Sequence, residues 1–199
     1  MTKDRILQVA TQEFSKYGFD AVSMNKLAVK LDVNKATIYY YFKDKQNLYQ
    51  SVMTNLISMN KDENEAILKS DLNPKEKFKK YIALFVKRMI NNPGIIPLSL
   101  REMANLGANV DHSIAIEIEY EILYLKKIVQ DLPLKDKYKD LDFYELKSVI
   151  MGTINSYYSF QMSHIDMIGL KDFNKQPQKV FDYLEHFVAN LLLDALCQE

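Results

Sequence analysis

The sequence predicts an all-α protein of nine helices, with a small N-terminal three-helix domain ahead of a larger helical bundle. Glycine and proline number only five each among the 199 residues, and strong helix formers are abundant. Apolar residues make up 48% of the chain and recur at helical spacing from its start. The chain can therefore bury a sizeable core between helices joined by short connections.

Three short helices are predicted in the first 43 residues. Residues 3–17 carry apolar side chains on one helical face, and Gly18 follows as a stop signal. Ser23 can cap a second short helix. Asp32 then lies in a tight turn, and Asn34 can cap a third helix of about two turns.

The larger part of the chain holds six further predicted helices. Their bounds follow from apolar periodicity and from capping and breaking residues. They cover residues 45–68, 73–91, 95–106, 113–130, 141–165 and 177–196.

The formal net charge of the chain is zero, but the charge is unevenly distributed. Residues 1–50 carry eight Lys or Arg against five Asp or Glu, and residues 51–199 carry 18 against 21. The basic excess marks the N-terminal part as the one suited to phosphates. No apolar stretch is long enough to span a membrane, no secretion signal is evident and Cys197 is the single cysteine, so we expect a cytoplasmic protein.

The segment NKATIYYYFKDK, residues 34–45, combines aromatic rings, hydroxyl groups and lysines. On a helix, Ile38 and Phe42 share the face toward the core, whereas Ala36 and Tyr40 point away from it. A short helix, a tight turn and a second helix with a polar-aromatic outer face form a helix-turn-helix, whose second helix enters the DNA major groove. The alternative is that the three tyrosines pack against the fourth helix.

A longer series of residues stands in a fixed order along the first 48 positions: Arg5-Ile6-Leu7, Ala10, Phe14, Gly18-Phe19, Val22-Ser23-Met24, Leu27-Ala28, Val33, Thr37 to Phe42, Lys45 and Leu48. In this order the chain resembles the N-terminal domain of the TetR family of bacterial transcriptional regulators. The resemblance implies a nine-helix fold that dimerises, with a DNA-binding domain at residues 1–46 and an effector-binding and dimerisation domain at residues 47–199.

The resemblance also implies which residues contact DNA. The family usually has glycine in the turn where this chain has Asp32, a residue type that tolerates a left-handed conformation. The implied DNA-binding residues are Ser23, Met24, Asn25, Lys35, Ala36, Thr37, Tyr39, Tyr40, Tyr41 and Lys45.

Small residues form a stripe on the predicted helix 141–165, and small side chains let two helices approach closely. The stripe and the apolar face of the last helix match the part of the family fold that forms the dimer, although a stripe of this kind can also pack inside one subunit. The predicted dimer residues are Gly152, Ser156, Ser159, Ser163, Leu184, Phe187 and Leu191.

The larger domain has no metal-ligand spacing, no glycine-rich phosphate loop and no nucleophile motif, so we expect neither a cofactor nor a metal and no enzyme activity. Its helices carry aromatic residues and methionines where the family binds effectors, which suggests a mostly apolar or aromatic ligand. These pocket candidates are Phe85, Met89, Met103, Tyr120, Tyr124, Met151, Tyr157, Phe160 and His164. Each can also be an ordinary core residue.

Glu117 and Glu121 share one helical face and would suit a cationic effector, although a solvated face is the simpler interpretation. The function predicted is that of a homodimeric repressor, released from a palindromic operator by a small effector. One alternative keeps the DNA-binding domain but makes the bundle a docking surface for a protein. A second alternative is an all-helical enzyme, but the sequence contains no acid-base or metal motif that supports it.

Overall fold

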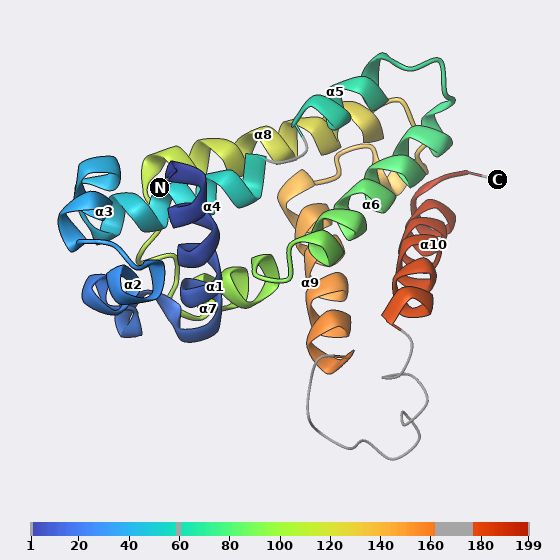
Figure 1. Cartoon of the computed structure of the whole chain (residues 1–199). Coiled ribbons are helices and arrows are strands. Elements are labelled where there is room, and N and C mark those ends of the chain that lie inside the picture. Colours follow the sequence, from blue (N-terminus) through green and yellow to red (C-terminus); the bar gives the residue numbers. More distant parts are fainter. Residues whose placement is uncertain (1, 59–60, 162–176, 199) are drawn as a thin grey trace. The chain divides into compact units, whose positions relative to one another are not determined.

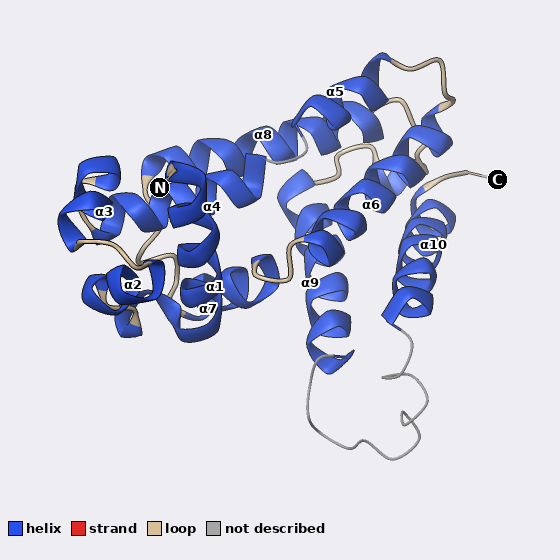
Figure 2. Ribbon diagram, in the orientation of Figure 1, coloured by secondary structure: helices blue, strands red, loops and turns tan. Residues whose placement is uncertain are grey.

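The computed structural model describes residues 2–58, 61–161 and 177–198, and within these ranges all the regular elements are helices (Figures 1 and 2). Of residues 160, 161, 177–181 and 183 it describes the backbone alone. The elements are α1 (Lys3–Ala21), α2 (Met24–Leu31), α3 (Lys35–Phe42), α4 (Lys45–Ser58), α5 (Lys61–Lys69), α6 (Pro74–Asn91), α7 (Ile95–Ala104), α8 (His112–Val129), a 3-10 helix (Asp136–Tyr138), α9 (Phe143–Gln161) and α10 (Pro177–Leu196).

The predicted all-α fold is confirmed. The first helix is interrupted at Gly18, which has φ 79° and ends the regular turns at the predicted position. The predicted helix 45–68 is described as α4 and α5, on either side of residues 59–60, which lie outside the described residues. The 3-10 turn at Asp136–Tyr138 was not predicted.

The chain forms two compact units. The first contains residues 1–59 and 92–118, and the second contains residues 60–91 and 119–199. The predicted DNA-binding domain, residues 1–46, falls within the first unit. Helix α8 runs without a break through the division, so its first seven residues belong to one unit and the rest to the other.

In the first unit, α1 packs on α2, α4 and α7. Its buried residues Ile6, Ala10 and Phe14 repeat every four positions and form the centre of the core. The Phe14 ring meets the buried Tyr49 ring of α4 edge to face, with centroids 4.9 Å apart. This core holds α4 against α1, and α4 also contacts α3.

In the second unit, α6 packs on both α10 and α5, and α9 contacts α10. The amide of Lys135 donates to the carbonyl of Leu196 (2.8 Å), and the amide of Gln198 donates to the carbonyl of Pro133 (2.8 Å). These bonds attach the end of α10 to the segment between α8 and α9. None of the described helices combines the length and the apolar character needed to cross a membrane.

Candidate nucleic-acid interface

The turn between α2 and α3 is made by local hydrogen bonds. Asp32 adopts a left-handed conformation (φ 55°, ψ 52°), as predicted for the position where glycine is usual. The amide of Val33 then donates to the carbonyl of Ala28 (3.0 Å) and closes the end of α2. The Oδ1 atom of Asn34 accepts from the amide of Ala36 (2.9 Å) and starts α3. Helices α2 and α3 thus form a helix-turn-helix.

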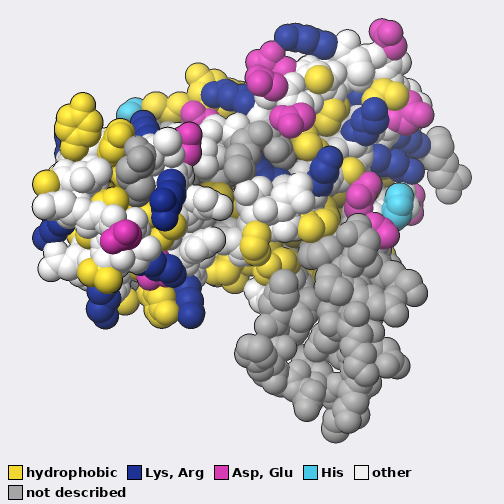
Figure 3. Space-filling model, viewed as in Figure 1, with side chains coloured by type: hydrophobic (Ala, Val, Ile, Leu, Met, Phe, Trp, Pro, Cys, Tyr) yellow, Lys and Arg dark blue, Asp and Glu magenta, His cyan; other side chains and the backbone are white. Residues whose placement is uncertain are grey.

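Helix α3 has one face in the core and one in solvent. Ile38 and Phe42 are buried, as expected from their spacing. Tyr40 lies opposite them and is 83% exposed, while Tyr39 and Tyr41 on the flanks are 36% and 37% exposed. The alternative in which the three rings pack against α4 is therefore wrong for Tyr40. Hydrophobic side chains, drawn in yellow, are visible on the surface over the α3 end of the first unit in Figure 3.

The other predicted DNA-binding residues differ in their exposure to solvent. Ala36 and Asn25 are exposed, and Lys35 and Thr37 are half-buried on the flanks of α3. Ser23 precedes α2 with extended backbone angles, but its side chain makes no capping hydrogen bond. Met24 is the exception, because its side chain is buried and presents nothing to a ligand.

Lys45, at the first position of α4, is held in place by two contacts within the first unit. Its ammonium donates to the carbonyl of Asp20 (3.2 Å) and lies 4.4 Å from the centroid of the Phe19 ring. Partial burial lowers the pKa of Lys45 below its ordinary value. A fixed cation at the start of a helix suits a phosphate, and the amide of Asn47 in the first turn of α4 already donates to Asp44 (2.7 Å).

Helix α4 is tied to α7 and to the loop after α7 by a buried carboxylate. Glu102 accepts from the hydroxyl of Tyr49 (2.5 Å) and from the Nδ2 atom of Asn109 (3.1 Å). Gln50 on α4 donates to the carbonyl of Asn109 (2.6 Å) and accepts from the amide of Asp111 (3.4 Å). Burial, followed by the bond to Glu102, raises the pKa of Tyr49. The sequence pattern did not single out Tyr49, Gln50, Glu102 or Asn109, because each occurs as an isolated polar residue.

The predicted effector residues do not gather at one described cavity. Phe85 and Met89 are buried in the second unit, and Tyr124 donates to Glu65 (3.3 Å) from a half-buried position. Tyr120 is exposed, with the ammonium of Lys61 4.1 Å from its ring centroid. Met151 and Tyr157 are half-buried on α9, and Met103 is exposed in the first unit. The remaining two candidates are the side chain of Phe160 and His164. The last two lie outside the described residues.

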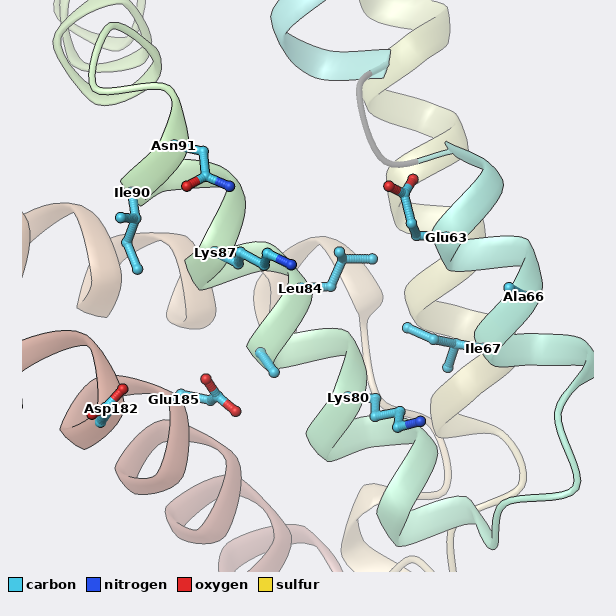
Figure 4. A pocket seen from close by; sticks show the side chains of 11 residues that line it. Glu63, Ala66, Ile67, Lys80, Leu84, Lys87, Ile90, Asn91, Asp182 and Glu185 are labelled. Carbon is cyan, nitrogen blue, oxygen red and sulfur yellow. The ribbon is translucent and has the colours of Figure 1, made fainter. Parts of the chain in front are cut away.

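A groove of about 610 Å³ is lined by residues of α5, α6 and α10. Lys80 and Lys87 stand on α6 between Glu63 of α5 and the carboxylates of Asp182 and Glu185 on α10 (Figure 4). No predicted effector residue lines this groove. No group of His, Cys, Asp and Glu side chains suited to a metal ion occurs in the described part of the chain.

A buried ionic cluster on three helices of the second unit was not predicted. Glu121 of α8 accepts from Arg88 of α6 (2.9 Å) and from Lys147 of α9 (3.0 Å), and Lys147 also donates to the hydroxyl of Tyr81 (2.9 Å). Burial alone would raise the pKa of the Glu121 carboxyl, but Lys147 and Arg88 bring that pKa below its ordinary value. The interpretation of Glu121 as part of a solvated face is wrong, and its charge is already engaged by two cations.

The predicted dimer residues divide into exposed and buried members. Gly152 and Ser156 are exposed on α9, where a Cβ atom at Gly152 would meet nothing within 4 Å. Phe187 and Leu191, one turn apart on α10, are 42% and 53% exposed. Leu184 is buried inside the subunit, Ser159 is half-buried, and Ser163 lies outside the described residues.

Comparison with known proteins agrees with this architecture. The family model described as "Bacterial regulatory proteins, tetR family" matches residues 6–52. The HTH-type transcriptional regulator YhgD of Bacillus subtilis is 28% identical over 131 residues, which cover 65% of this chain and 68% of that protein. The HTH-type transcriptional repressor NicS of Pseudomonas putida is 27% identical over 113 residues, which cover 56% of this chain and 53% of that protein.

Solved structures share the fold over nearly the whole chain. The TetR-family regulator PfmR of Thermus thermophilus superposes with a TM-score of 0.71 at 16% identity, covering 100% of this chain and 98% of that one. The ketosteroid transcriptional regulator KstR2 of Mycobacterium tuberculosis has the same TM-score at 14% identity, covering 98% and 95%. The solved structures show the shared fold. The family match at residues 6–52, which covers the helix-turn-helix, and the sequence relatives identify the chain as a member of the TetR family of bacterial transcriptional regulators, which bind DNA and are not enzymes.

Proposed function

We propose that this regulator is a homodimer that binds a palindromic operator through two copies of α3. The observation that carries the proposal is the outer face of α3, where Tyr40 is 83% exposed directly opposite the buried Ile38 and Phe42. A helix supported on one side and free on the other is what major-groove binding requires. A single two-turn helix binds DNA weakly, so a pair about 34 Å apart is expected.

The side chains of α3 suit different parts of the DNA. Ala36 and Tyr40 face outward and reach base edges, where the methyl group of Ala36 suits thymine. In the proposed complex, the hydroxyl groups of Thr37, Tyr39 and Tyr41 on the flanks contact phosphate oxygens, as hydroxyl groups commonly do. Lysines add the electrostatic part of the affinity, which does not depend on sequence.

The proposed dimer uses the exposed faces of α9 and α10. On α9, the small residues Gly152 and Ser156 are exposed and would allow a partner helix to approach closely. On α10, the exposed side chains of Phe187 and Leu191 supply apolar area to the proposed four-helix interface. Val149, 54% exposed on α9, extends this surface and was not predicted. Small residues beside apolar ones allow close packing of two identical helix pairs around a two-fold axis.

Release of DNA is proposed to follow from an effector in the second unit. Helix α8 belongs to both units, and the segment before it bonds to Gln50 of α4. A ligand that favours a different position of α8 therefore has a direct route to α4, which follows α3 in the chain. A coupling free energy of about 1–3 kcal/mol is sufficient for regulation. The names of relatives such as NicS, a repressor, support negative control.

Selection of bound fragments from random DNA by the purified protein tests this function, together with the mass of the free protein in solution. We expect a palindromic motif and a dimeric mass. Binding that shows no sequence preference even at low salt would contradict the proposal. A motif without any response to small molecules would leave DNA recognition intact and favour a protein partner for the bundle.

A further inference from the structure

Helix α9 carries two polar side chains on its inner face, Lys147 and Asn155, which the proposed function does not yet use. Lys147 is 8% exposed and Asn155 is 2% exposed. Eight residues of α-helix separate them, a rise of about 12 Å. Ile154 and Tyr158 are buried on the same side of α9, so both polar side chains lie on the buried face of the helix.

Lys147 has an incomplete set of acceptors. Its ammonium donates to the hydroxyl of Tyr81 (2.9 Å) and to Glu121 (3.0 Å), which leaves one of its three protons for a further acceptor. The Glu121 carboxylate is shared, because its other oxygen accepts from Arg88 (2.9 Å). The Phe85 ring, 4.4 Å from the ammonium, provides apolar contact but no lone pair. A single additional oxygen with negative charge would complete this environment.

Asn155 points to a ligand independently. Neither its Nδ2 nor its Oδ1 atom has a hydrogen-bond partner among the described residues, although the side chain is almost fully buried. A buried amide without partners destabilises a fold, because the hydrogen bonds that it makes with water in the unfolded chain are not replaced. An amide at this position becomes favourable when a bound molecule offers it a hydroxyl or carbonyl group.

We propose that the effector is an amphipathic monocarboxylate that binds along the inner face of α9. Its carboxylate accepts from Lys147, its apolar body lies beside Phe85 and Met151, and a hydroxyl or carbonyl group about 12 Å away bonds to Asn155. A monoanion fits better than a phosphate dianion, because Glu121 already neutralises part of the positive charge. The inference rests on the proposed function, since it names the ligand of the proposed effector-binding unit.

Matched probes test the carboxylate end. Binding of decanoate, decanamide and decylamine to the full-length protein is measured by calorimetry, with hexanoate and tetradecanoate as length controls. We expect decanoate to bind at least about tenfold more tightly than the amide or the amine. Lys147→Met should remove this preference, Lys147→Arg should keep it, and Lys79→Met, which alters an exposed lysine of α6, should not affect it. Lys147→Met is expected to fold, because Glu121 stays paired with Arg88.

A second pair of probes tests the amide end. We expect ω-hydroxydecanoate to bind more tightly than decanoate to the natural protein and equally tightly to Asn155→Leu. If Asn155 has only a structural role, Asn155→Leu should raise the melting temperature. The difference in affinity between ω-hydroxydecanoate and decanoate should then be the same as in the natural protein.

Four results overturn the inference: no carboxylate binds, the amide binds as tightly as decanoate, Lys147→Met keeps the preference for decanoate, or Asn155→Leu keeps the preference for ω-hydroxydecanoate. Fragment selection from random DNA is run on the same preparation. A recovered motif without carboxylate binding defeats the inference alone, whereas carboxylate binding without any motif defeats the proposed function.

Discussion

At the scale of single residues, Lys45 illustrates how one side chain serves both the fold and the proposed interface. Its bond to the carbonyl of Asp20 and its contact with Phe19 fix the ammonium at the start of α4. We expect Lys45→Ala to weaken binding to all DNA sequences alike and to reduce the slope of log affinity against log salt by about 1. Operator affinity measured over a salt series checks this, with Lys69→Ala in the second unit as the control. An unchanged slope would remove Lys45 from the interface.

Glu121 makes the stability of the second unit depend on pH. Its folded-state pKa lies below the ordinary value of 4.5, so the unfolded chain binds the proton first as the pH falls. The stabilisation is fully present above about pH 4.5 and is lost as the pH drops through the folded-state pKa. Urea unfolding of Glu121→Gln between neutral and acid pH should show a smaller loss of stability on acidification than the natural protein. Equal losses in both proteins would show that the ion pairs of Glu121 with Lys147 and Arg88 contribute nothing to the loss of stability at acid pH.

At the scale of elements, the α2–α3 turn depends on the left-handed backbone of Asp32. A β-branched residue is strained in this conformation, so Asp32→Val should lower the free energy of unfolding by about 1–2 kcal/mol. Asp32→Gly should leave it within about 1 kcal/mol of the natural value, since glycine adopts the conformation freely. Chemical denaturation of the two variants tests the difference. If both variants are equally stable, the turn carries no conformational constraint.

Helix positions and the outward face of α3 were predictable from the sequence, because capping residues and apolar spacing act over a few residues. Asn34 begins α3, and Gly18 interrupts α1, at the predicted places. Buried polar clusters were not predictable in this way. Lys147 lies among Leu146, Ile150 and Ile154 on the apolar side of α9, but periodicity alone assigns a lysine to solvent.

The same limit explains the mixed result for the dimer residues. The spacing of Leu184, Phe187 and Leu191 along α10 is the same whether a residue packs inside the subunit or faces outward. The structure buries Leu184 and leaves the other two exposed. Met24 is a comparable case, since a resemblance transfers a position but not the direction of its side chain. Only tertiary packing decides such questions.

At the scale of the whole molecule, the proposed dimer makes DNA binding depend on a surface far along the chain from α3. Leu191 is 53% exposed, so Leu191→Asp should fold as a monomer. We expect sedimentation to show half the natural mass and operator affinity to fall to the level of nonspecific binding. Leu123→Asp, at a leucine 48% exposed on α8, is the matched control and should remain dimeric. A dimeric Leu191→Asp would place the interface elsewhere.

The most direct test of the proposed regulator is the discrimination between its selected operator and a scrambled sequence, measured at one salt concentration for the natural protein and for Tyr40→Ala. Because Tyr40 is exposed and opposite the core, the variant should fold normally and lose about 1–3 kcal/mol of that discrimination. Tyr17→Ala, at another exposed tyrosine of the first unit, should retain it. Full discrimination by Tyr40→Ala would contradict the assignment of the outer face of α3 to base recognition.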